Sequence, residues 1–242
     1  MDINEHLGGI DVSIAEMADQ LIRLRVVAGG LSLDHSITHP LKLQAGSALL
    51  TSSLDLGTAI ARLNQSDPEH SWVAAHLLHR PQFEHFMRGA FFAGPATSEE
   101  AQTFLDQDRM PRRAGETGKW GSMTLAQVVK ETSDHWGGGD IPSQVFEGTK
   151  VDLHGLVHGG KVIVDIYTHG PALGANKATT EEVCGSMNNP LVVSAIALES
   201  LLTLSVRDQA VEGAKGELRR AHALLGRVSP LADKVLGPRR GL

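Results

Sequence analysis

The sequence predicts an all-α protein built as a helical bundle. Three observations support this fold class. Apolar residues recur at helical spacing along most of the chain, the breaks between these stretches are short and marked by Gly or Pro, and only residues 162–167 have the β-branched character of a strand. With 242 residues the chain is long enough to bury one sizeable core.

The first two helices are expected over residues 11–28 and 39–64. The first carries an apolar seam at coiled-coil-like spacing, formed by Ile14, Met17, Leu21 and Leu24. Gly29 and Gly30 end it, and Pro40 suits the first turn of the second helix. A short helix cannot bury such a seam alone, so we predict a homodimer formed through it.

The third helix is expected over residues 69–93, with an interruption at Pro81 and a kink near Leu77. Its apolar residues lie on every side, which is typical of a buried helix. A short helix follows over residues 97–108, with Thr97 or Ser98 as its N-cap.

The remaining chain is expected to be loop over 109–121, then helices over 122–135, 143–158, 190–208 and 212–227. Asn188 or Asn189 would cap the helix that begins at Pro190, and residues 191–206 would join 73–92 at the centre of the bundle. We divide the chain into a bundle domain, residues 1–210, and a C-terminal helix with a basic tail, residues 211–242.

Composition narrows the functional classes. The formal charge is −6, yet residues 213–242 contain seven basic and two acidic residues, a balance that suits nucleic acid or an acidic partner as well as a solvated helix. Aromatic residues make up only 4%, and Cys184 is the single cysteine, which excludes an internal disulfide. Neither a signal peptide nor a membrane span is visible, so we expect a cytoplasmic protein.

Arg80, Glu84 and Arg88 are the first candidate site. Residues four apart share one face of a helix, and here they interrupt an apolar stretch. One carboxylate between two guanidiniums leaves a surplus positive charge that suits an anionic or phosphoryl ligand. The alternatives are a structural ion network or a pairing with Glu199 of a later helix.

His154 and His158 are the second candidate. Their spacing places both on one helix face, where two histidines can bind zinc if a third ligand is present. His158 is followed by Gly159 and Gly160, a setting that suits a general acid or base or a plain helix end. The sequence has neither a P-loop nor a GxGxxG motif, and we expect no cofactor.

Residues 78–89 resemble the hallmark LLRPxFExxxRG of an uncharacterised bacterial helical family, and His158-Gly159-Gly160 is similar to its second motif, THGG, with Val157 in place of Thr. Members of that family are similar to HEPN-type helical bundles. The resemblance implies a HEPN-like fold and a role in toxin–antitoxin or phage-defence systems. Many HEPN proteins are metal-independent ribonucleases that act as dimers. It also implies an Arg and a His four to six residues apart on one helix.

Arg80 and His85 have that spacing, but five residues along a helix correspond to a rotation of about 140°, so we expect them to point to different sides. We therefore expect Arg80, Glu84, Arg88 and His158 to meet in one pocket. Arg80 and Arg88 would stabilise phosphate charge and His158 would transfer a proton. The partners would then be RNA or a cognate protein. The alternatives are a non-catalytic helical module for dimerisation or partner binding, and a metal-dependent hydrolase using His154 and His158.

Overall fold

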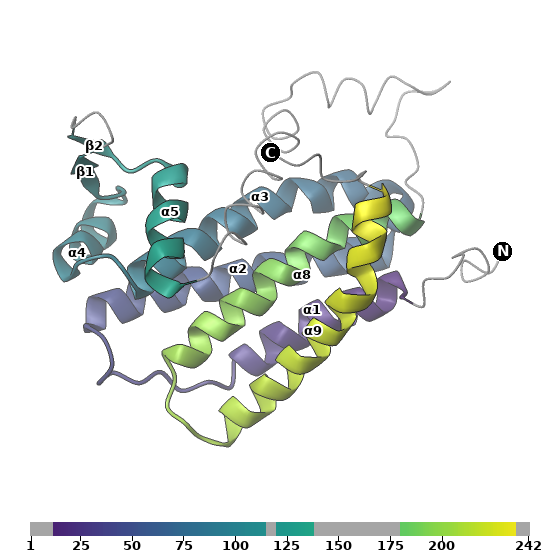
Figure 1. Ribbon diagram of the computed structural model, residues 1–242, viewed down its shortest axis with the longest axis horizontal. Helices are drawn as coiled ribbons and strands as arrows, with labels where there is room; N and C mark the ends of the chain where they lie inside the picture. The colour runs from purple at the N-terminus through teal and green to yellow at the C-terminus, as the bar shows by residue number, and fades with distance from the viewer. Residues whose placement is uncertain (1–11, 115–119, 138–179, 236–242) are drawn as a thin grey trace.

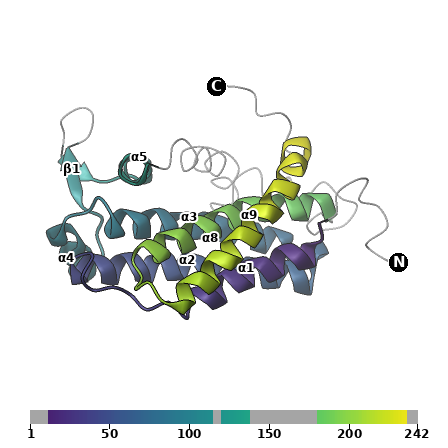
Figure 2. The ribbon, with the colours of Figure 1, turned by 60° about the horizontal axis from the view of Figure 1, so that its bottom comes forward.

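The computed structural model describes residues 12–114, 120–137 and 180–235. In these ranges the chain forms seven helices and one two-stranded antiparallel sheet, which confirms the all-α prediction (Figure 1). The long helices pack side by side as a bundle, and a smaller unit of short elements covers one end of it (Figures 1 and 2).

Helices α1 (Ile14–Ala28), α2 (Pro40–Ser66) and α3 (Pro68–Ala93) begin and end close to the predicted positions. The Ser13 hydroxyl accepts a hydrogen bond from the Glu16 backbone N–H and caps α1, and Pro40 lies in the first turn of α2. Helix α3 continues through Pro81, so the expected interruption does not end the helix.

Helices α2 and α3 form an antiparallel hairpin with close backbone contact. A Cβ atom added to Gly89 would lie 2.8 Å from the backbone nitrogen of Leu50, and one added to Gly46 would lie 2.9 Å from the backbone nitrogen of Ala93. The missing side chains let the two helices approach, which fixes their register along the part of α3 that bears the candidate site.

The prediction for the helix at Pro190 is wrong. Helix α8 spans Thr180–Thr203 and contains Pro190 in its interior. Val183, Cys184 and Met187, which precede the proline, are buried in the core. Burial of this apolar segment against the bundle offsets the lost backbone hydrogen bond, so the Asn188–Pro190 pattern does not start the helix.

Helix α8 lies at the centre of the bundle, in contact with α1, α2, α3 and the last helix, α9 (Gln209–Val235), as the prediction for residues 191–206 requires (Figures 1 and 2). Helix α9 contributes Ala214, Leu218, Ala221, Leu224 and Val228 to the same core cluster. This part of the predicted C-terminal segment therefore packs on the bundle.

The seam of α1 is buried inside the chain. Met17, Leu21 and Leu24 are at most 1% exposed, because α1 packs against α2, α8 and α9. The argument for a homodimer through this seam is therefore wrong: the neighbours that the seam needs are supplied by the same chain.

The smaller unit consists of α4 (Ser98–Gln107), β1 (Arg112–Ala114), β2 (Trp120–Ser122) and α5 (Leu125–Trp136). Thr97 caps α4, as predicted, in a reciprocal capping box with Glu100. The strands pair antiparallel with Arg113 opposite Gly121, where a loop was predicted. Strands of three residues are too short to leave an alternating pattern in the sequence.

The helix predicted over 143–158, the strand over 162–167, and both His154 and His158 lie outside the described residues. Among the helices that the structure does describe, none combines the length and hydropathy needed to cross a membrane.

Candidate functional site

The structure brings Arg80, Glu84 and Arg88 together on one side of α3. Arg80 Nε donates to Glu84 Oε1 at 3.0 Å, and an Arg88 guanidinium nitrogen lies 3.5 Å from Glu84 Oε2. Their side chains are 29%, 24% and 37% exposed. The predicted spacing is confirmed, and α3 buries many of its apolar residues as predicted, but the side that bears these ions is only partly buried.

Arg88 is the residue of this group with the weakest attachment. Its contact with Glu84 is an ion pair without a hydrogen bond, and within the described ranges no hydrogen bond from its guanidinium is found. Among the described residues, one carboxylate thus serves two guanidiniums, which leaves a surplus positive charge on a partly exposed surface. Such an arginine has donors in a planar fork that suits a carboxylate or phosphate.

His85 joins this group. Its Nδ1 atom lies 2.9 Å from the Ser52 hydroxyl of α2, and its ring lies close enough to Arg88 and Glu84 to interact with both charges. Burial lowers the pKa of His85 and the positive charge of Arg88 lowers it further, against a smaller opposing effect of Glu84. The imidazole is therefore neutral at pH 7 and can accept a proton. We call Arg80, Glu84, His85 and Arg88 the α3 polar stripe.

The position of His85 follows from the packing of α2 on α3. The Ser53 hydroxyl donates to the Gln82 backbone oxygen at 2.9 Å, which sets the register at this level, and Ser52 then faces His85. The sequence analysis excludes His85 from the site because its side chain is rotated by about 140° from that of Arg80. The spacing that indicates its place in the site is the three residues between His85 and Arg88, which put these two on one face of the helix.

The opposite side of α3 carries a buried polar layer. Gln82 Nε2 donates to the Pro190 backbone oxygen at 3.1 Å and to the Ser194 hydroxyl at 3.0 Å, both on α8. His79 Nδ1 lies 3.3 Å from Gln82 Oε1, while its Nε2 is buried without a hydrogen-bond partner among the described residues. Burial lowers the pKa of His79 to about 4. This layer fixes α3 against α8 and thereby orients the α3 polar stripe outward.

The other candidates receive less support. Glu199 is exposed on α8, and no ion pair joins it to the α3 polar stripe in the described part of the chain. His154 and His158 lie outside the described residues, and the described ranges contain no cluster of three metal-ligating side chains.

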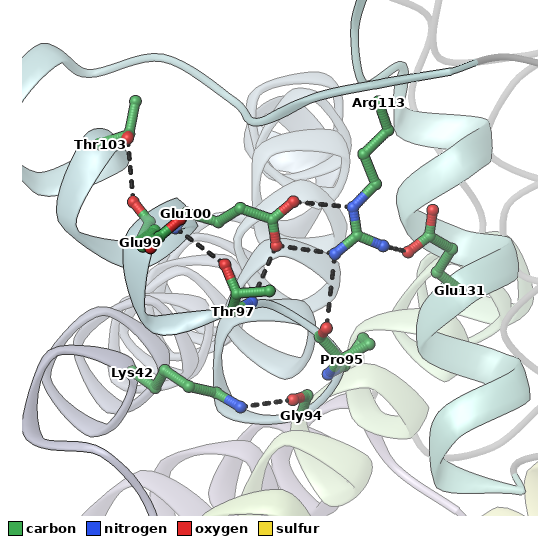
Figure 3. A network of polar contacts seen from close by, with 9 residues as sticks. All are labelled: Lys42, Gly94, Pro95, Thr97, Glu99, Glu100, Thr103, Arg113 and Glu131. Atoms are coloured by element: carbon green, nitrogen blue, oxygen red, sulfur yellow. Dashed lines mark hydrogen bonds and ion pairs between the residues drawn. The ribbon is translucent and has the colours of Figure 1, made fainter. Parts of the chain in front are cut away.

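A second polar cluster lies in the smaller unit (Figure 3). Arg113 donates to both carboxylate oxygens of Glu100, at 2.8 and 2.7 Å, and also forms an ion pair with Glu131 of α5. It donates to the Pro95 backbone oxygen at 3.4 Å, and its guanidinium carbon lies 5.2 Å from the centre of the Phe91 ring. We call this the Arg113 network; it connects α4, β1 and α5 to the end of α3.

Comparison with known proteins gives no relative: no family model, curated protein or solved structure matches this chain. The assignment of a function therefore depends on the geometry of the two clusters. The Arg113 network has its donors and acceptors paired, whereas the α3 polar stripe combines surplus positive charge with a neutral histidine. The stripe is the better candidate for a functional site.

Proposed function

We propose that this protein is a HEPN-like, metal-independent ribonuclease, and that the α3 polar stripe binds the phosphate of the cleaved bond. The observation that supports this proposal is a half-exposed Arg88, without a hydrogen bond in the described ranges, beside the neutral His85. Arginine recognises phosphate by charge and by its donor fork, and a neutral imidazole is the usual base at pH 7.

The proposed reaction needs no metal. His85 removes the proton from the ribose 2′-hydroxyl, whose oxygen attacks the adjacent phosphorus. The bond to the 5′-oxygen breaks, that oxygen takes up a proton, and the products carry a 2′,3′-cyclic phosphate and a 5′-hydroxyl. Arg80 and Arg88 stabilise the negative charge that develops on the phosphate. His158 remains the sequence-based candidate for the second proton transfer.

Ser52 gives His85 its orientation in this scheme. With Nδ1–H donating to the Ser52 hydroxyl, the lone pair on Nε2 is available to accept the proton. Glu84 positions both arginines. Neither residue needs to touch the reacting atoms.

The test is cleavage of end-labelled RNA in the presence of EDTA. We expect the wild type to cleave, and Arg88→Ala to reduce the rate by about 10²–10³-fold, the usual cost of removing one donor to a developing oxyanion. The matched control is Arg23→Ala, which removes an arginine from an i, i+4 pair with Asp19 on α1. The proposal fails if the wild type leaves RNA intact or if both variants have equal effects.

A role in toxin–antitoxin or phage defence, with a cognate protein as partner, belongs to the same proposal. The homodimer remains a prediction, but the α1 seam no longer supports it. Light scattering at high micromolar concentration tests it directly, and a monomer mass would contradict it.

A further inference from the structure

A surface pocket of about 400 Å³ lies beside α2, and one of its lining residues, Ser52, contacts His85 of the α3 polar stripe. Its walls come from the end of α1, the following loop, one side of α2 and Leu201 of α8. Its lining combines apolar residues, among them Leu31, Leu33 and Leu201, with polar residues, among them Arg25, Ser52 and Asp55.

The polar wall presents a donor beside an acceptor. Arg25 Nε donates to Asp55 Oδ1 at 2.5 Å, and the two side chains are 30% and 58% exposed, so a ligand can reach both. Guanine has two adjacent donors, N1–H and the N2 amino group, that a carboxylate can accept together, and its O6 and N7 atoms are the preferred acceptors for arginine. Adenine, cytosine and uracil lack that pair of adjacent donors.

Ser52 connects this pocket to the α3 polar stripe. It belongs to the pocket wall, and its hydroxyl lies 2.9 Å from His85, which in turn interacts with Arg88. The pocket and the α3 polar stripe thus meet at Ser52. We propose that this pocket binds a guanine base of the RNA and makes the cleavage selective for the bond that follows guanine, an inference that rests on the proposed ribonuclease function.

Binding of free nucleosides tests the pocket without the phosphate site. Guanosine, adenosine, cytidine and uridine are titrated into the full chain by calorimetry. We expect guanosine to bind at least about tenfold more tightly than the other three, as expected for one bidentate base contact. Asp55→Asn should remove that preference, while the control Asp19→Asn, which alters an exposed Asp–Arg pair outside the pocket, should retain it. Equal affinities for the four nucleosides, or a preference that survives Asp55→Asn, would overturn the inference.

The cleavage products separate this inference from the function on which it rests. Mapping the 3′ ends should give cyclic phosphates after guanine in the wild type and after all four bases in Asp55→Asn. Cleavage without base preference in the wild type would refute the guanine pocket and leave the ribonuclease intact. Selective binding of guanosine without any cleavage would refute the ribonuclease and leave the pocket as a guanine site.

Discussion

The α3 polar stripe and the Arg113 network contain the same residue types in opposite proportion. The stripe has two arginines for one glutamate, whereas the network has one arginine for two glutamates. Arg113 is held by two bonds to Glu100, an ion pair to Glu131, a backbone oxygen and an aromatic face. Arg88, by contrast, has only a 3.5 Å ion pair among the contacts of the described residues.

This difference in charge balance distinguishes a structural ion cluster from one that can bind a ligand. Burial alone would raise the pKa of Glu100, but the hydrogen bonds from Arg113 and Thr97 outweigh it and lower that pKa. The native state therefore depends on this contact, as expected of a structural network. A cluster whose charges are not balanced contributes less to folding and retains the capacity to bind a ligand of opposite charge.

Acid should have the largest expected effect on stability, and it should act at His79, which lies on the inner side of α3 opposite the polar stripe. Its folded-state pKa of about 4 lies below the ordinary value of 6.5, so the unfolded chain binds this proton more readily. The stabilisation is complete above pH 6.5 and is lost as the pH falls toward 4, by about 3 kcal/mol in all. The lowered pKa of Glu100 removes further stability at lower pH, as that carboxylate becomes protonated.

Urea unfolding between pH 7.5 and 4 measures this dependence. His79→Gln should remove most of the slope between pH 6.5 and 4.5, whatever its effect at pH 7, and Glu100→Gln should leave that slope unchanged. An unchanged slope in His79→Gln would mean that His79 does not control the acid response of this helix.

The second-largest expected effect is the loss of stability when an arginine of either cluster is replaced. Arg113→Ala strands two half-buried carboxylates and should lower the free energy of unfolding by about 2–3 kcal/mol, somewhat less than for a fully buried pair. Arg88→Ala leaves Glu84 with Arg80 and should cost less than about 0.5 kcal/mol. Urea unfolding at pH 7 compares the two, and equal losses would show that the stripe is a second structural network.

The sequence predicts the helices with clear local signals. Pro40 and Thr97 lie where their helices begin, because capping and fixed backbone angles act within one turn. The Pro190 prediction failed because the same local rule is overridden by burial of the preceding turns of α8.

The candidate site was predictable only in part. The i, i+4 spacing brings Arg80, Glu84 and Arg88 together, but a helix with apolar residues on every side does not reveal which side stays half-exposed. Ser52 and His85 are 33 residues apart, so their pairing depends on the register of α2 on α3, and no periodicity within either helix encodes it. The apolar seam of α1 likewise predicts that the helix packs against a neighbour. Its spacing does not indicate whether that neighbour belongs to the same chain or to a second copy.

Glu84→Ala and Glu100→Ala should give the smallest difference in stability between the two clusters and the sharpest comparison, because Glu84 and Glu100 are both half-buried carboxylates bonded to arginine. Glu84→Ala leaves two mutually repelling but half-exposed guanidiniums, which water can solvate, so the expected loss is about 1 kcal/mol. Glu100→Ala breaks the bidentate contact and the α4 capping box and should cost about 2 kcal/mol. Because Glu84→Ala also removes the competing carboxylate, inorganic phosphate should bind this variant more tightly than the wild type, measured by titration followed by NMR. A loss above 3 kcal/mol without tighter phosphate binding would identify the stripe as structural and remove the basis for its role in RNA cleavage.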